Sequence, residues 1–431
     1  MIGVEFSRIP ERILPYMDTI QVTNLGEHIT FASAPFANPM PQEEVLRRYL
    51  SNYVTNNKGN IFSARPDIKK IKGKLMRNLG ITHRYESPPL SETRTLADVV
   101  DESATIGALL VQKIMQEKGW NTIDFLMVGS ATLPDLSAQV LEKTGLQHHD
   151  VFTTDDHVEC ADSVVQFINA LTNPALRGKN GIIFNTNPLS YLQHPRHFYD
   201  QLAIGILFGD QHIAWGFNTA DFIPHSWHIT FVPDGGTIYM QTGYEVPKFD
   251  PSVIPAHLQN HISFIEKNGV DPRTRVSITE RGIRMSQSDP SEINQNLPAY
   301  MNNDLTGSHF IEVTPNVFLD IIESFYRENP AATLAYGIIH DPSLLVSLGI
   351  MRKTMHGADK RGIPKPFIKP LFAAGFLLGE MQCSNSAGST PPKKFQYMAE
   401  QNMIHPEGYF FLGAPGVGST VAGIIAEYVP K

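Results

Sequence analysis

The sequence predicts an α/β fold with largely buried sheets, built from two similar halves. Apolar runs of strand length alternate with helix-length segments along the chain. These runs are continuously apolar, which is typical of strands that are covered on both faces. At 431 residues the chain also exceeds the usual limit for one hydrophobic core, so we expect two packed half-domains.

The expected strands are short apolar segments bounded by turn residues. They are Phe125–Val128, Gly181–Phe184, Ile204–Phe208, Leu334–Ile339 and Tyr409–Leu412, with a last interior strand over Gly418–Tyr428. Helices are expected between them, where apolar residues recur at helical spacing. These helices are Ile106–Lys118, Ala161–Leu171, Pro315–Glu328 and Ser343–Met351.

A weak internal repeat supports the division into two halves. The segments DFLMVGSATLPDLSAQVL and TLAYGIIHDPSLLVSLGI each contain an apolar strand, a polar turn with proline and a helix. We place the halves at residues 1–240 and 241–431, as an ancient duplication would. Residues 241–310 are rich in Pro, Asn, Asp and Ser, which predicts an irregular insertion.

The composition excludes several classes of protein. A net charge of −8 argues against general nucleic-acid binding. No apolar run reaches the ~18 residues of a membrane span, and the N-terminus lacks an apolar signal core, so we expect a cytoplasmic location. Two cysteines form neither a disulfide framework nor a zinc motif, so no metal is expected.

Cys160 is the first candidate catalytic residue. It stands where a polar, β-rich run ends and the expected helix Ala161–Leu171 begins. Unpaired backbone N–H groups and the positive end of the helix dipole favour a thiolate at that position, so Cys160 is a candidate nucleophile. A structural cysteine is the alternative, because cysteine outside disulfides is among the most buried residue types.

Two further residues strengthen the catalytic interpretation. His340 directly follows the expected strand Leu334–Ile339, and Asn385 lies in the small-residue run CSNSAGST. Each alone is more often structural. Together with Cys160 they suit acyl transfer and decarboxylative carbon–carbon bond formation, because cysteine carries an acyl thioester while His and Asn hold a carbonyl oxygen. Cys383 lacks the helix-start context and is expected to be a small buried residue.

With these residues the chain resembles the thiolase superfamily, specifically its β-ketoacyl-acyl-carrier-protein synthase III branch. Seven short matches occur in the family's order: Leu79–Arg84 (TGI-x-x-R), Phe125–Leu141 (strand, turn and helix), Glu159–Ala161 (A-C-A), Phe208–Asp210 (start of FGDGAGA), His340 (PHQAN), Asn385–Ser389 (GNTSAAS) and Pro415–Gly418 (C-terminal Gly-rich loop). The resemblance implies a thiolase-like, five-layered αβαβα fold from two similar halves. It also implies a homodimer.

The resemblance implies roles for the site residues. Cys160 would be acylated by a primer thioester, and His340 and Asn385 would donate hydrogen bonds to the thioester carbonyl of a malonyl- or β-ketoacyl-type extender. The N–H of Cys160 and a backbone N–H of the loop at Gly416 and Val417 would form the oxyanion hole. Substrates would arrive on coenzyme A or on the phosphopantetheine of an acyl carrier protein, with no metal or redox cofactor.

Departures from the family pattern favour a specialised, secondary-metabolism relative. Bulky Gln211 and His212 replace small residues after Asp210. Glu159 places a carboxylate beside the nucleophile, which should raise the thiol pKa. Either this side chain points away, or it is a general base for ring closure. If Glu159 is such a base, the chain resembles the ketosynthases that form cyclohexanediones on the way to bacterial dialkylresorcinols and stilbenes.

Two basic runs are candidate docking sites for a carrier protein or for coenzyme A, although most such runs are solvated faces. Their residues are Lys69, Lys70, Lys72 and Lys74 in the first run and Arg352 and Lys353 in the second. Two other functions stay open: a Cys160-dependent acyltransferase to a hydroxyl or amine, and a non-catalytic subunit of a heterodimeric synthase. Asn385 favours condensation over simple transfer, because it helps to hold an enolate.

Overall fold

The protein is described here by a computed structural model, and its described residues are 19–34, 39–45, 77–87, 94–131, 133, 135–192, 207–231, 275–279, 282–286, 303–416 and 420–430. Two sheets dominate this part of the chain. The first contains six strands and the second contains four.

In spatial order, the first sheet comprises β1 (Gln21–Leu25), β2 (Ile29–Ala34), β8 (Gln211–Asn218), β7 (Asn180–Asn187), β5 (Phe125–Gly129) and β6 (Phe152–Asp156). The second comprises, in spatial order, β12 (Leu334–Ile339), β13 (Tyr409–Gly416), β14 (Thr420–Tyr428) and β9 (Phe222–Phe231). Strand β5 pairs in parallel with β6 and β7, and β12 pairs in parallel with β13. The other pairs in these two sheets are antiparallel.

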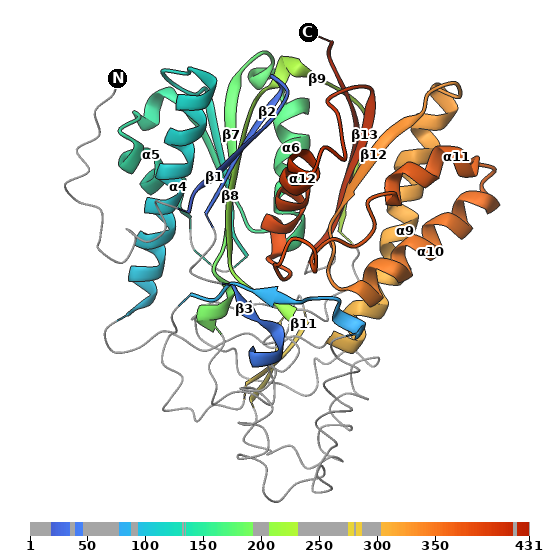
Figure 1. Ribbon diagram of the computed structural model, residues 1–431, viewed down its shortest axis with the longest axis horizontal. Helices are drawn as coiled ribbons and strands as arrows, with labels where there is room; N and C mark the ends of the chain where they lie inside the picture. Colours follow the sequence, from blue (N-terminus) through green and yellow to red (C-terminus); the bar gives the residue numbers. More distant parts are fainter. Residues whose placement is uncertain are drawn as a thin grey trace, which may run out of the picture.

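Helices complete five layers (Figure 1). Helices α4 (Leu96–Lys118) and α5 (Ser137–Thr144) cover the outer face of the first sheet. Helices α6 (Asp162–Thr172) and α12 (Thr390–Glu400) lie between the sheets. Helices α9 (Asn303–Glu328), α10 (Leu344–Lys360) and the short α11 (Lys365–Ile368) cover the second sheet. The layering is therefore αβαβα, as the family resemblance implies.

Local sequence explains the ends of the longest helix of the first half. At the start of α4, Thr95 accepts a hydrogen bond from the N–H of Asp98, whose carboxylate accepts one from the N–H of Thr95. This reciprocal capping box satisfies donors that have no partner within the helix. The helix ends at Gly119, whose φ of 66° is left-handed and favours glycine.

The central helix α6 is buried on nearly all sides, its polar residues Asp162 and Gln166 included, because both sheets contact it. The ring of Phe167 lies at the middle of an aromatic cluster drawn from both sheets. Its ring centroid lies 5.0 Å from Trp215, 5.3 Å from Phe217, 5.4 Å from Phe222 and 6.2 Å from Phe410. This cluster holds the two sheets on one helix, so it fixes how the halves meet.

Of the expected strand Ile204–Phe208, only the last two residues belong to the described part of the chain. There Phe208 forms a single bridge with Asn385, and the next strand, β8, begins at Gln211. The strand β8 begins with polar residues. One of them, His212, is buried with its Nδ1 2.6 Å from the hydroxyl of Thr186. A buried polar side chain with a hydrogen-bond partner is compatible with an interior strand.

The expected halves can be compared with the sheets. The chain passes from the first sheet to the second between Asn218 and Phe222, ahead of the expected boundary at residue 240. Most of the expected insertion at residues 241–310 lies outside the described residues. Within it, β10 (Arg275–Thr279) pairs with β11 (Gly282–Ser286). A second small pair joins β3 (Met40–Pro41) to β4 (His83–Arg84).

Replacing Phe167 by Ala should lower the free energy of unfolding by about 3–5 kcal/mol, because the change opens a cavity between the two sheets. Denaturant unfolding followed by tryptophan fluorescence measures the loss. Met403→Ala is the control, since Met403 is 45% exposed and should change stability by less than about 0.5 kcal/mol. Equal stability of the two variants would contradict the central role of the cluster.

Candidate active site

Cys160 lies in a tight turn that leads into α6. The turn is a single 3-10 turn, η3 (Glu159–Ala161), and α6 begins at the next residue. The carboxylate of Asp162 accepts a hydrogen bond of 2.6 Å from the N–H of Val158, which closes the turn. The expected position of Cys160 at a helix start is confirmed. Cys160 is only 3% exposed, which suits a structural cysteine as well as a nucleophile. The residues around it therefore distinguish the two roles.

The end of β13 lies directly against this turn. A Cβ atom at Gly416 would lie 2.6 Å from the carbonyl oxygen of Val158 and 3.1 Å from the N–H nitrogen of Ala161. Such distances are too short for any side chain, so glycine is required for this close approach. The second half of the chain thereby reaches the Cys160 turn of the first half.

His340 lies at the end of β12, beside the same strand. Its N–H donates to the carbonyl of Gly413 in β13 over 2.9 Å. The imidazole is fully buried, and among the described residues neither ring nitrogen has a hydrogen-bond partner. Burial, assisted by the positive charge of Lys394, lowers the pKa of His340 to about 3. The ring is therefore neutral near pH 7, with one N–H donor and one acceptor.

Asn385 is held by its backbone between residues of the first half. Its N–H donates to Leu207 and its carbonyl accepts from the N–H of Gly209, over 3.2 Å and 3.1 Å. Its Oδ1 accepts from the N–H of Ala387, and its Nδ2 donates to the carbonyl of Pro342. These bonds fix the amide with Nδ2, its donor atom, facing the segment that carries His340.

The three predicted catalytic residues therefore converge. The turn that follows Asn385, η11 (Ala387–Ser389), packs against the Cys160 turn. Its Ser389 accepts a hydrogen bond from Asn187 at the end of β7. The Cys160 turn also contacts β13, which in turn holds His340. The segments that carry the thiol, the imidazole and the amide thus meet where the parallel strands end, a common position for active sites in α/β folds.

Several predicted site residues cannot be placed. Val417 and the first basic run (Lys69, Lys70, Lys72 and Lys74) lie outside the described residues, as does the side chain of Glu159. In the second run, Arg352 and Lys353 lie exposed on α10. Lys353 forms an ion pair with Glu312, which neutralises part of the charge available for docking. The docking role of both runs stays a prediction.

The second cysteine has the properties expected of a structural residue. Cys383 is buried, and burial raises the pKa of its thiol to about 12. It is therefore protonated near neutral pH, and a thiol is a far weaker nucleophile than a thiolate.

A buried carboxyl that the sequence did not single out as functional lies next to Asn385. Asp210 accepts hydrogen bonds from the N–H groups of Ser190 and Ser87 and from the hydroxyl of Ser190. Its own N–H donates to Tyr85. Burial raises the pKa of Asp210 to about 6, against the opposing effect of these bonds. Asp210 therefore ties the segments of Ser87 and Ser190 to the strand segment that pairs with the Asn385 backbone.

A buried ion pair was not expected from the sequence. Lys394 of α12 lies 2.9 Å from the carboxylate of Asp341, the residue after His340. The adjacent lysines of α12 suggest a solvated surface. The burial of Lys394 could have been inferred from its position, because it lies on the same helical face as the buried residues Pro391 and Met398.

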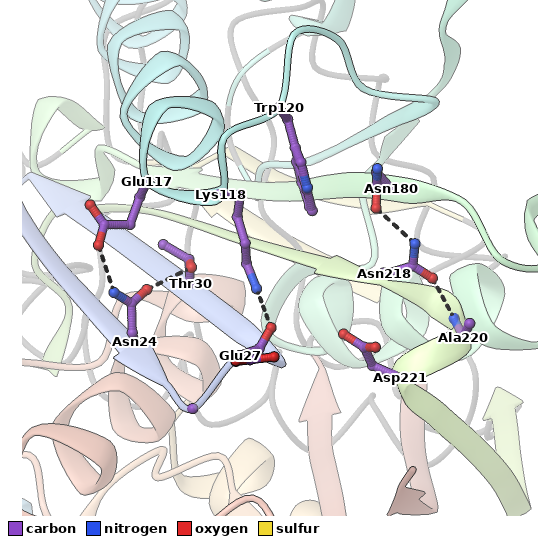
Figure 2. Close-up of a pocket in the computed structure, with 11 residues that line it drawn as sticks. Asn24, Glu27, Thr30, Glu117, Lys118, Trp120, Asn180, Asn218, Ala220 and Asp221 are labelled. Carbon is purple, nitrogen blue, oxygen red and sulfur yellow. Dashed lines mark hydrogen bonds between the residues drawn. The ribbon is translucent and has the colours of Figure 1, made fainter. Parts of the chain in front are cut away.

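A separate hollow of about 620 Å³ lies at the other end of the first sheet (Figure 2). Asn180, the first residue of β7, lines it, whereas the last residue of β7 contacts the Asn385 turn. The hollow is polar, and Figure 2 shows Lys118 donating to the backbone of Glu27 beside Trp120. At ~3.3 Å per residue, the length of β7 separates it from the catalytic residues by more than ~20 Å.

Two further features concern the described residues as a whole. None of their helices combines the length and hydropathy needed to cross a bilayer. No three of their His, Cys, Asp and Glu side chains are grouped as metal ligands would be.

No protein-family profile and no curated protein sequence matches the chain. Solved structures do match along nearly its whole length. The 3-oxoacyl-[acyl-carrier-protein] synthase III of Aquifex aeolicus is 11% identical, with a TM-score of 0.56, over 95% of this chain and 100% of that one.

Two other matches are similar in extent. The 1,3,6,8-tetrahydroxynaphthalene synthase of Streptomyces coelicolor, a type III polyketide synthase, is 12% identical over 93% of this chain and 99% of its own, with a TM-score of 0.63. An OleA variant of Xanthomonas campestris is 10% identical over 95% and 98%, with a TM-score of 0.56. These matches confirm the thiolase-like fold expected from the sequence.

Asp210 should make stability depend on pH. Its pKa is 3.8 when exposed and about 6 in the folded protein, so its neutral form is favoured by folding. This contribution is fully present below pH 3.8 and is lost as the pH rises through about 6. In Asp210→Asn, thermal unfolding should show a smaller fall in stability between these pH values than the wild type. Identical pH profiles would contradict the raised pKa.

Proposed function

We propose that the protein is a ketosynthase, which forms a carbon–carbon bond by Claisen-type condensation. The acyl group of one thioester would be held on Cys160 and joined to a second, malonyl- or β-ketoacyl-type thioester. The observation that carries this proposal is the convergence of the Cys160 turn, a neutral buried His340 and an oriented Asn385 amide. The fold, shared with synthases that perform condensation, supports it.

The first half-reaction uses Cys160. Its thiolate attacks the carbonyl carbon of the primer thioester, and the coenzyme A or carrier-protein thiol leaves with a proton. The backbone N–H of Cys160 and an N–H of the loop at Gly416 and Val417 would bind the oxygen of the tetrahedral intermediate. The close approach at Gly416 supports this assignment, because it brings the end of β13 onto the Cys160 turn.

The second half-reaction uses His340 and Asn385. Both would donate hydrogen bonds to the thioester oxygen of the extender as its α-carbon becomes an enolate. A malonyl-type extender forms that enolate by losing CO2, whereas a β-ketoacyl extender forms it by losing an α-proton. The enolate carbon then attacks the acyl-Cys160 carbonyl, and the Cys160 thiolate leaves. A neutral imidazole suits this role because it can donate one hydrogen bond without having to lose a charge.

The alternatives use less of the site. A Cys160-dependent transfer to a hydroxyl or amine needs the thiol and an oxyanion hole, but it forms no enolate for Asn385 to hold. A non-catalytic subunit has no need for the thiol, imidazole and amide together. Condensation accounts for all three groups, so we prefer it.

Incubation with acyl-coenzyme A should leave one acyl group on Cys160. Intact-mass spectrometry after mixing with acetyl-, octanoyl- or lauroyl-coenzyme A should show the adduct, and Cys160→Ala should abolish it. Cys383→Ala is a matched control, because its buried thiol with a pKa of about 12 should not react. An adduct that persists in Cys160→Ala would refute the assignment. Addition of malonyl-coenzyme A should then release a β-keto product; an adduct discharged only to hydroxyl or amine acceptors would favour transfer.

For the finer function, we propose that Glu159 acts as a general base in ring closure to a cyclohexanedione after condensation. Glu159 directly precedes the nucleophile in the sequence, at the start of the η3 turn. Glu159→Gln keeps the size of the side chain but cannot accept a proton at neutral pH. With a β-ketoacyl extender, this variant should release open-chain product in place of the ring. Unchanged ring formation, measured by product mass spectrometry, would exclude the base role.

The remaining expectations stay predictions. They are the use of coenzyme A or acyl-carrier-protein thioesters, a homodimer, the absence of a metal or redox cofactor and a cytoplasmic location. For the homodimer, β6 is a suitable surface, since it lies at one edge of the first sheet and Phe152 is exposed on it. Exposed strand edges readily pair with a second chain.

A further inference from the structure

Lys394 and Asp341 form an ion pair that is almost completely removed from solvent. The side chains are 4% and 3% exposed, and their charged atoms lie 2.9 Å apart. Buried charges are costly unless their hydrogen bonds are all satisfied. Here they are: the ammonium donates to Asp341 Oδ2 and to the carbonyls of Ile339 and Gly375, which uses its three hydrogens.

Two of these three bonds go to the residues on either side of His340. The carbonyl of Ile339 precedes His340, and the carboxylate of Asp341 follows it. Asp341 is itself fixed by the N–H of Leu377 and the hydroxyl of Ser347. Lys394 therefore holds the residues on both sides of His340. It does so from α12, the helix that begins shortly after Asn385.

The imidazole of His340 depends on its backbone for its orientation. Among the described residues, neither of its ring nitrogens has a hydrogen-bond partner that would orient it. Most buried imidazoles are oriented by a bond from one ring nitrogen. The direction of this ring is therefore determined by its backbone position and by packing.

We propose that Lys394, paired with Asp341, is a positioning residue that holds His340 and Asn385 in register for the second half-reaction. One ammonium group joins the His340 segment to the helix that follows Asn385, while the Asn385 amide joins the same segment at Pro342. The two hydrogen-bond donors are thus fixed relative to each other. This inference rests on the proposed function, because it concerns the step that uses these donors.

The charge of Lys394 also supports the role of His340 as a neutral hydrogen-bond donor. Next to burial, it contributes to the low pKa of His340 and so helps to keep the ring neutral. A merely structural ion pair would stabilise the fold without favouring one half-reaction over the other. The two half-reactions therefore distinguish positioning from stability.

The test is the double variant Lys394→Met/Asp341→Asn. Removing both charges together avoids a buried charge without a partner, so the protein should fold. We expect the rate of Cys160 acylation by acyl-coenzyme A to be unchanged. Condensation with malonyl-coenzyme A should fall by about 10–100-fold, in kcat rather than KM, because a displacement of about 1 Å has such an effect.

Lys393→Met is the matched control. Lys393 is the neighbouring lysine of α12, but its ammonium donates to Gln21 and Ser33 of the first sheet and to Gln396 of α12 itself. It should leave both half-reactions at the wild-type ratio. Equal condensation in the double variant and the wild type would overturn the proposal, as would a parallel fall of both half-reactions.

Crystal structures of the wild type and the double variant provide a readout without turnover. The His340 ring should be displaced or multiply oriented in the double variant and unchanged in Lys393→Met. An unmoved ring in the double variant would overturn the positioning role. An inactive wild type would instead refute the proposed function, and the position of His340 would still decide the role of Lys394.

Discussion

The close packing of the two halves is the constraint on which the candidate site depends. The thiol belongs to the first half, whereas the imidazole and the amide belong to the second. At the tip of β13, the separation of the halves is limited by the contact of Gly416 with the Cys160 turn. Deeper in the molecule it is limited by the aromatic cluster around Phe167. Because protein interiors are close-packed, neither contact allows the halves to slide past each other.

The electrostatics of the site follow from the same packing. His340 and His212 are buried as neutral rings, and burial lowers the pKa of each to about 3. The full charges of Lys394 and Asp341 are buried only because each has the other and a complete set of hydrogen bonds. A dry, mostly neutral region strengthens the hydrogen bonds formed within it. An enolate oxygen formed there would interact strongly with two fixed donors.

Most of the fold, and the positions in it of the candidate residues Cys160 and His340, could be predicted from the sequence, because the deciding signals are local. The strand Leu334–Ile339 and the helix start after Cys160 are visible as apolar periodicity. The errors arise where a polar residue finds a distant partner. His212 is buried beside Thr186, so a polar residue stands inside β8 where an apolar pattern alone would not place one. Likewise Lys394 owes its burial to Asp341, and no local pattern reveals a bond across 53 positions of the chain.

The backbone of Asn385 has a consequence for how the chain becomes active. It is bonded on both sides to Leu207 and Gly209, and Phe208 pairs with it as in a short parallel ladder. Contacts between residues so far apart in sequence form late, because closing a long loop has a high entropic cost. The donors of the second half therefore meet the thiol only when both halves are folded. Under the proposed function, a partly synthesised chain would carry the cysteine without the groups that direct its chemistry, so a nascent chain should not discharge cellular thioesters.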